Sequence, residues 1–242
     1  MLDVMPMLLL MLFSIALTIG GATIVLVVRR AERPPAVPPG PEFSPASRPC
    51  FMRRPESWLA IKSRSVLAVQ SALALHNPKP CPLLKGMAGE EKLFISPPVK
   101  GWILVIGSGL PEPSEDVDAC FRFLVEVSRK LGHVQFFSAG RVLQNHAWVQ
   151  ADAGRVVRAY AWAGKTLWKQ GHRTAAETEL NLKCFDYTDP AQRIAYGQPD
   201  VVAANVEKVP LLAARWSLDP ARLDEGFLEN ERGIAGEPSR RF

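Results

Sequence analysis

A run of 24 residues without an ionisable side chain, from Met5 to Val28, constrains this chain more than any other feature. A helix rises 1.5 Å per residue, so about 20 apolar residues already cross a hydrocarbon core of roughly 30 Å. A cleaved signal peptide would begin with basic residues and have a shorter apolar region. This start is acidic, at Asp3, although the small residues at 20–22 leave cleavage open. Residues 5–28 are therefore predicted to form a transmembrane helix.

The charges beside the apolar run predict its orientation. No Lys or Arg precedes the run, whereas Arg29, Arg30 and Arg33 follow it directly. Basic residues are retained on the cytoplasmic side of a membrane. The N-terminus is therefore expected outside and the rest of the chain in the cytoplasm. An envelope component with an outward-facing domain is the alternative that this charge pattern opposes.

A proline-rich linker separates the apolar run from the rest of the chain. Eight prolines lie between Pro34 and Pro55, and each fixes φ and removes a backbone donor. Residues 29–55 are therefore predicted to be a basic flank and a spacer, which would reach roughly 70 Å if fully extended as polyproline II. A ligand for an SH3-like module is the alternative, because 34–39 contains the PxxP spacing.

Composition and charge place the remainder among globular domains. Of the 242 residues, 48% are hydrophobic and 22% are charged, which favours a folded domain over disorder. The net charge of +5 comes from basic residues that are scattered among acidic ones, so nucleic acid is disfavoured as a partner. A faint helix-turn-helix pattern at 211–224 has no turn glycine and carries acidic residues in its second helix. We predict one globular domain over 56–227 and a polar tail over 228–242.

Hydrophobic periodicity in this domain alternates between strand and helix patterns. Strand-like runs lie at 57–62, 92–96, 101–107, 134–138 and 166–170, and helical spacing at 65–75, 174–182, 200–209, 210–216 and 219–228. The clearest helix lies within 110–133, with Ser114 as a candidate cap, Gly132 as its end and Phe121 in the apolar stripe that faces a sheet. Prolines break 77–82 into a loop. The pattern predicts an α+β fold, in which a mostly antiparallel sheet of five or six strands packs against helices.

The most informative motif is the hairpin pattern HAWVQADAGRVVRAYAW, residues 146–162. A three-residue turn over 152–154 would join its two alternating runs and place Trp148 opposite Arg158. One face of this hairpin then carries His146, Trp148, Arg158, Tyr160 and Trp162.

Two interpretations of this hairpin face stay open. Aromatic residues and Arg are enriched in binding hot spots, so the five residues are a candidate binding surface for a protein partner. Trp and Tyr are also large hydrophobic residues with one polar handle, and these residue types favour burial in a core. The exposure of the five side chains decides between the two.

Catalytic and metal-binding motifs give little support to an enzyme. The four His residues lie in separate segments, and the four Cys residues are far apart, without the spacing of a zinc site or a dense disulfide framework. Gly107-Ser108-Gly109 lacks the third glycine of a dinucleotide-binding loop and the pattern around a hydrolase nucleophile. No catalytic residue, metal or cofactor is predicted. An enzyme of unknown reaction, with a site near the loop 107–116, is the alternative.

These features together predict a single-pass membrane protein that is anchored through residues 5–28. Its cytoplasmic α+β domain is expected to bind or sequester a protein partner. This function follows from the predicted topology and from the hairpin face, and it does not come from a family motif.

Overall fold

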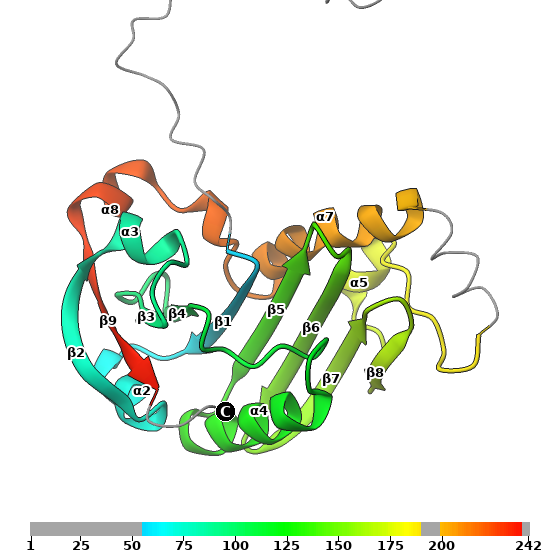
Figure 1. The fold of residues 1–242 in the computed structure, drawn as a ribbon, viewed down its shortest axis with the longest axis horizontal. Helices are drawn as coiled ribbons and strands as arrows, with labels where there is room; N and C mark the ends of the chain where they lie inside the picture. The colour runs from blue at the N-terminus through cyan, green and yellow to red at the C-terminus, as the bar shows by residue number, and fades with distance from the viewer. Residues whose placement is uncertain (1–54, 190–198, 239–242) are drawn as a thin grey trace, which may run out of the picture. The chain divides into compact units, whose positions relative to one another are not determined.

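The computed structural model describes residues 55–189 and 199–238 of the chain. They form a nine-stranded antiparallel sheet with helices on both faces (Figure 1), in the strand order β2-β9-β3-β4-β1-β5-β6-β7-β8. The strands are β1 (Ser57–Lys62), β2 (Leu75–Pro82), β3 (Leu93–Ile95), β4 (Trp102–Ile106), β5 (Val134–Gly140), β6 (Asn145–Asp152), β7 (Arg155–Trp162), β8 (Thr166–Gln170) and β9 (Arg232–Pro238). The helices are α2 (Val66–Ala72), α3 (Leu83–Met87), α4 (Val117–Leu131), α5 (Ala175–Glu179), α7 (Pro199–Trp216), the 3₁₀ turn η1 (Pro220–Arg222) and α8 (Glu225–Asn230).

The predicted α+β class and the antiparallel sheet are confirmed, but the sheet has nine strands in place of five or six. Two of the additional strands come from segments with weak strand patterns. β2 includes the stretch that the prolines indicated to be a loop. β9 lies within 228–242, the segment expected to be a polar tail, so the folded domain extends to Pro238.

β2 forms one edge of the sheet in spite of its prolines. Among the strands of the described residues it pairs only with β9, and its register shifts between His76 and Lys79. An edge strand makes ladder hydrogen bonds on one side only, so residues without an N–H are tolerated there. Prolines on such an edge also hinder pairing with a strand from another chain. The three prolines of β2 are Pro78, Pro80 and Pro82.

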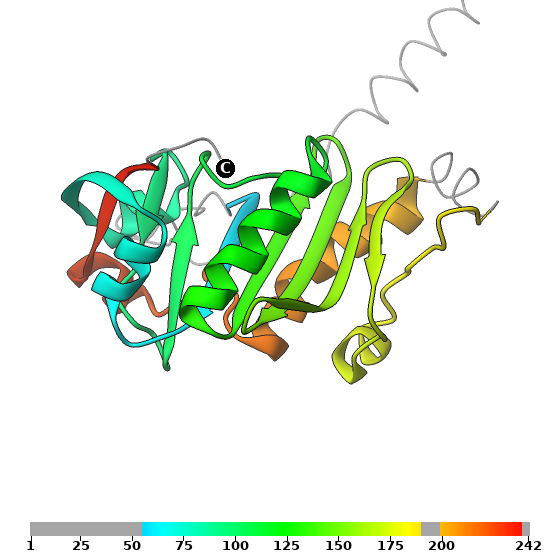
Figure 2. The same cartoon turned by 90° about the horizontal axis from the view of Figure 1, so that it is seen from below.

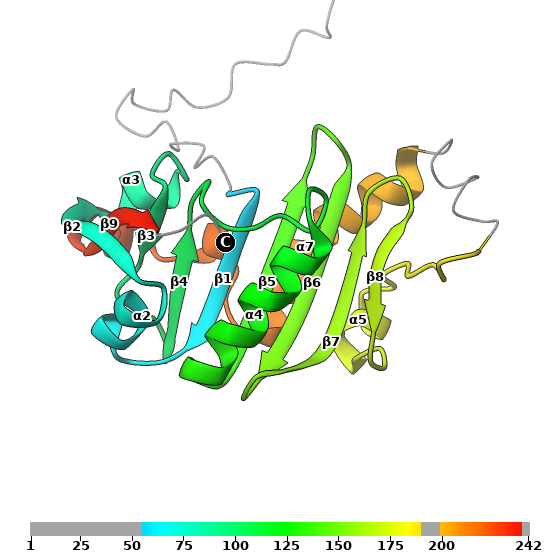
Figure 3. The same cartoon turned by 60° about the horizontal axis from the view of Figure 1, so that its bottom comes forward.

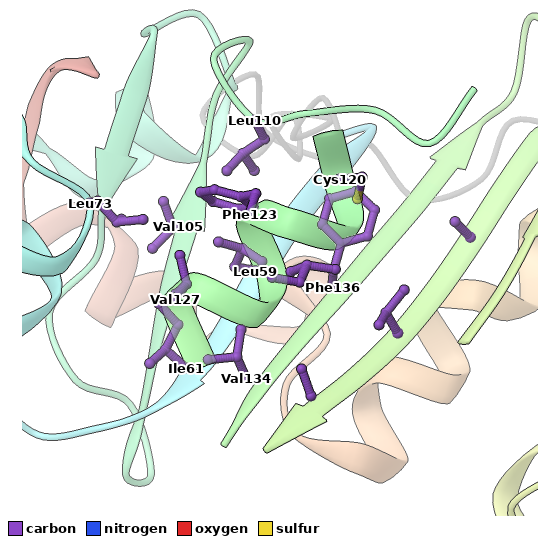
Figure 4. Packing of buried hydrophobic residues seen from close by; sticks show 14 of the residues in the cluster. Leu59, Ile61, Leu73, Val105, Leu110, Cys120, Phe123, Val127, Val134 and Phe136 are labelled. Atoms are coloured by element: carbon purple, nitrogen blue, oxygen red, sulfur yellow. The ribbon is translucent and has the colours of Figure 1, made fainter. Parts of the chain in front are cut away.

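Helices cover both faces of the sheet (Figures 2 and 3), and a hydrophobic core lies on each face. The α4-side core lies under α2 and α4 and includes Leu59 and Phe136 (Figure 4). The α7-side core lies under α3, α5, α7 and α8 and includes Trp58 and Phe137. Successive side chains of a strand point to opposite faces, so neighbours in the sequence enter different cores. All four of these side chains are buried.

α4 begins and ends close to the predicted positions. The carboxylate of Asp116 accepts a hydrogen bond of 2.8 Å from the backbone N–H of Ala119, so Asp116 is the N-cap in place of the predicted Ser114. Gly132 follows the helix with a φ of +81°, a region that glycine enters without steric cost. The carboxylate at the N-terminus and the basic residues of the last turn both suit the helix dipole.

The C-terminal helices differ from the prediction in their boundaries. The two segments predicted at 200–209 and 210–216 form the single helix α7, with Pro210 inside it. The segment 219–228 divides into η1 and α8, and the carboxylate of Asp219 caps the 3₁₀ turn. α7 crosses the sheet over β5 and β6.

No helix among the described residues is long and apolar enough to cross a membrane. The predicted transmembrane helix, 5–28, lies outside the described residues. The linker predicted over 29–55 also lies outside them, apart from Pro55.

Candidate functional site

The hairpin predicted over residues 146–162 is present as β6 and β7, but its turn is shorter than expected. Asp152 pairs with Arg155, so only Ala153 and Gly154 form the turn. Both residues have positive φ, +45° and +80°, as a type I′ turn requires. This two-residue turn suits the right-handed twist of paired strands.

The shorter turn changes which residues face one another. An irregularity in the ladder follows Gln150, which pairs with Arg158. Trp148 pairs with Tyr160 instead of the predicted Arg158, and their ring centroids are 5.0 Å apart. The two-residue turn alone would place Trp148 opposite Ala159, but the irregularity adds one residue on β7, so the side chains that were predicted to share a face still do so.

The five side chains of the candidate binding surface lie inside the protein. They belong to the face of the sheet that α5 and α7 cover. This face is therefore core, which decides between the two interpretations of the hairpin face in favour of burial. The exposed fractions are 3% for His146, 0% for Trp148, 1% for Arg158, 0% for Tyr160 and 3% for Trp162.

Arg158 is buried because it pairs with the carboxylate of Glu177, the third of the five residues in α5. The guanidinium Nε lies 3.0 Å from each carboxylate oxygen, and Nη2 lies 2.6 Å from Oε1. The Glu177 side chain is 0% exposed. The remaining guanidinium nitrogen, Nη1, donates to backbone carbonyls of β7 and of the end of β8. A buried ion pair of this kind is tolerated because both charges are paired and hydrogen-bonded.

Glu177 also accepts hydrogen bonds from two other residues. The indole N–H of Trp148 donates to Oε1 at 2.7 Å. The backbone N–H and the hydroxyl of Thr174 donate to Oε2 at 2.8 Å and 3.0 Å, in a capping box at the start of α5. Burial alone would raise the pKa of Glu177, but the hydrogen bonds from Arg158 and Thr174 hold the pKa below its ordinary value. The carboxylate thus ties α5 to the sheet.

His146 occupies the other end of the same buried face. Its ring stacks between those of Trp148 and Trp162, with centroid distances of 5.7 Å and 5.5 Å. The amide nitrogen of Asn205, from α7, lies 3.1 Å from Nε2. The backbone of Lys183 orients this amide, since its N–H donates to Oδ1 and its carbonyl accepts from Nδ2. An amide nitrogen only donates, so we infer that Nε2 accepts and that the proton of the neutral ring is on Nδ1. Burial lowers the pKa of His146 to about 4, so the imidazole is neutral near pH 7.

A small cavity lies on the opposite face of the sheet, where the loop 107–116 passes over the ends of β5 and β6. The carboxylate of Glu112 accepts a hydrogen bond of 2.9 Å from the hydroxyl of Ser138. Burial raises the pKa of Glu112, although hydrogen bonds from Ser57 and Ser138 oppose this shift. The cavity volume is about 10 Å³, which is room for one water molecule at most. This loop therefore holds one protonatable carboxyl beside a cavity that no organic substrate would fit.

The described residues contain no group of three or more His, Cys, Asp or Glu side chains that could hold a metal ion. Cys81, Cys120 and Cys184 are free thiols. Burial raises the pKa of the Cys184 thiol to about 11, so it is not a thiolate nucleophile near neutral pH.

Two surface features were not identified from the sequence. Phe121, which was predicted to lie in the buried stripe of α4, is 39% exposed, and Phe123 is buried in its place. Val142 and Leu143, at the tip of the β5–β6 hairpin, are 87% and 78% exposed. The helical stripe is wide enough to include either phenylalanine, so spacing alone does not distinguish them.

Comparisons with known proteins return no match: no family model, no curated protein and no solved structure is similar to this chain.

Proposed function

We propose that the chain is a single-pass membrane protein whose cytoplasmic domain binds a protein partner through the outer face of α4. The membrane anchor rests on the uncharged run 5–28 and on the arginines that follow it. The binding role rests on one observation above all, which is the exposed aromatic and basic surface of α4.

Phe121 is the centre of this surface. Its ring makes a T-shaped contact with the Trp168 ring from β8, with centroids 5.7 Å apart and planes at 70°. Trp168 is 6% exposed, so the exposed ring of Phe121 packs against a buried ring, and this contact limits the motion of Phe121. An aromatic ring held in this way loses little conformational entropy when a partner covers it.

Two basic residues follow Phe121 along the helix, and the acidic Asp118 lies one turn before it. Arg122 is its neighbour, and Arg129 lies two turns further on the same side of α4; both are exposed. The acidic Glu126 between them pairs with Lys130 at 2.7 Å, which offsets its charge. An exposed aromatic residue beside arginines has the composition of a binding hot spot. A partner with an apolar pocket and acidic residues at its rim would complement this surface.

The edges of the sheet favour a helix face over strand addition as the binding mode. Prolines occupy the β2 edge. At the β8 edge, the hydroxyl of Tyr187 accepts from the backbone N–H of Lys169 at 2.8 Å and lies 3.2 Å from the carbonyl oxygen of the same residue. These backbone groups are therefore occupied, and a peptide strand would have to displace the tyrosine.

Site-specific photo-crosslinking in cells tests the binding surface. A benzoylphenylalanine at position 121 of the full chain is expected to give a discrete adduct with another protein. The same group at Leu211 of α7, which is 37% exposed, is the matched control and should give none. Arg122→Glu should abolish the adduct without lowering the melting temperature. Equal adducts at both positions, or none at 121, would contradict the proposal.

Reporter fusions test the anchor and its orientation. A C-terminal alkaline phosphatase is expected to be inactive, because the enzyme folds only outside the cytoplasm. An active fusion would instead favour an envelope component with an outward-facing domain. A mature N-terminus near residue 23 would show that the apolar run is a cleaved signal peptide.

A further inference from the structure

The tip of the β5–β6 hairpin carries the two most exposed large apolar side chains among the described residues, Val142 and Leu143. They are neighbours in the sequence, and together they form a small apolar patch on the surface. Isolated exposed apolar residues are common and need no explanation. An adjacent pair at the end of a hairpin calls for one.

The base of this hairpin is fixed to the rest of the domain. Arg141 pairs with Glu207 of α7, with Nε 2.8 Å from Oε1. The side-chain amide of Asn145 donates to the hydroxyl of Ser114 at 3.0 Å, which links the hairpin to the loop before α4. A β-carbon at Gly140 would overlap the side chain of Asn145. The tip is therefore held out from a base that contacts both faces of the sheet.

The turn between β7 and β8 lies beside this tip. β6 pairs with β7, and His146 faces Trp162 at the end where both turns project. A shallow open hollow lies between the two turns and is lined by Leu143 and by Ala163, Gly164 and Lys165. Lys165 is exposed, so a positively charged side chain lies next to the small apolar patch.

The chain enters the domain at this same end of the sheet. β1 is antiparallel to β5, and Ser57 pairs with Ser138. The backbone N–H of Ala139 donates to the carbonyl of Glu56 at 2.7 Å, directly before the hairpin. Figures 1 and 3 show the start of β1 and the β5–β6 hairpin at one end of the sheet, with α2 at the other end. A tether that reaches the domain from the N-terminal side therefore joins it next to the apolar tip.

We propose that this tip, Val142 and Leu143 with Lys165 beside them, contacts the lipid surface of the membrane to which the chain is anchored. The proposal rests on the anchoring proposed above. Apolar side chains would enter the boundary between headgroups and acyl chains, and the ammonium would lie among lipid phosphates. Two apolar residues bind a bilayer weakly alone, but a tether raises their effective concentration near it to the millimolar range. The contact would fix which end of the domain faces the membrane and leave α4 accessible.

Tryptophan quenching by brominated lipids tests this contact. The full chain is reconstituted into nanodiscs of equimolar phosphatidylcholine and phosphatidylglycerol, with and without bromine on the acyl chains. Leu143→Trp places a probe at the tip, and Leu67→Trp places one on α2 at the opposite end, where Leu67 is 73% exposed. The emission of the parent chain, with its own tryptophans, is subtracted from both.

The added tryptophan at position 143 is expected to lose most of its emission in brominated nanodiscs, whereas the one at position 67 keeps its emission. Adding Val142→Asp to Leu143→Trp should restore emission, because the charge opposes insertion. Equal quenching at both positions, or none at 143, would overturn the proposal. A blue shift at 143 without quenching would also overturn it, since a protein or a second copy would then cover the tip. A chain that does not enter nanodiscs refutes the anchor itself, and the lipid contact with it.

Discussion

Removing the charge of Arg158 while keeping its bulk is the most direct perturbation of the buried ion pair. Arg158→Met deletes three contacts to the Glu177 carboxylate, two of 3.0 Å and one of 2.6 Å. The carboxylate keeps the donors of Trp148 and Thr174 but loses its counter-charge at 0% exposure. Three backbone carbonyls lose a donor as well.

The expected cost at pH 7 is about 3 to 5 kcal/mol of the free energy of unfolding, the range for a buried pair that loses one partner. A domain of ordinary stability has about 5 to 15 kcal/mol in total, so the melting temperature should fall steeply. Adding Glu177→Gln to Arg158→Met removes the stranded charge. The double variant should therefore be more stable than Arg158→Met alone.

The single variant Arg158→Met should also change how the free energy of unfolding depends on pH. In the parent, Arg158 helps to hold the pKa of Glu177 below its ordinary value, so this contribution is complete above an unfolded pKa of about 4.3 and is lost in acid. Without Arg158, burial dominates and the folded pKa moves above the unfolded one. The folded variant then takes up a proton that the unfolded chain does not, and it gains stability as the pH falls from 7 towards 5. The difference in the free energy of unfolding between the parent and Arg158→Met should therefore become smaller from pH 7 to pH 5.

Urea unfolding of the fragment 55–242, followed by tryptophan fluorescence at pH 7 and pH 5, measures both effects. Arg141→Met is the matched control, because it breaks a pair with Glu207 whose side chains are 49% and 57% exposed. Exposed pairs contribute about 0 to 1 kcal/mol. A cost below about 1 kcal/mol for Arg158→Met, or a gap that does not narrow towards pH 5, would refute the reasoning.

Two further predictions concern the other end of the buried face and the C-terminus. Burial lowers the pKa of folded His146 to about 4 from an ordinary value of 6.5, so the unfolded chain binds a proton at a higher pH than the folded chain does. Between pH 6.5 and pH 4 the free energy of unfolding of the parent should therefore fall by about 3 kcal/mol more than that of His146→Gln, as measured by urea unfolding. A fragment from Glu56 to Phe242 is expected to be soluble with a cooperative thermal transition. The same fragment ending at Asn230 should lose that transition, because β9 lies between β2 and β3; equal melting curves of the two fragments would contradict this role for β9.

Much of the central sheet could be predicted from the sequence, because the signal is local there. The short strand-like run at 57–62 forms β1. The amphipathic stretch within 110–133 forms α4, with a glycine after its last residue. β9 could not be found in this way. Its sequence, RGIAGEP, contains two glycines and a final proline, and its strand conformation depends on pairing with β2 and β3, which are far away in the sequence. Tertiary contacts override weak local preference in such segments.

The composition of the 146–162 hairpin could not decide between surface and core, because a binding hot spot and a buried ion-pair core use the same residue types. What decides is the partner of Arg158. The sequence does contain a signal for it: Thr174 and Glu177 have the Thr-x-x-Glu spacing of a capping box. That signal predicts the start of α5, but it does not indicate that the carboxylate reaches across to a strand 19 residues earlier. An arginine on a strand face is therefore evidence for a partner only after the nearby carboxylates have been excluded as its counter-charge.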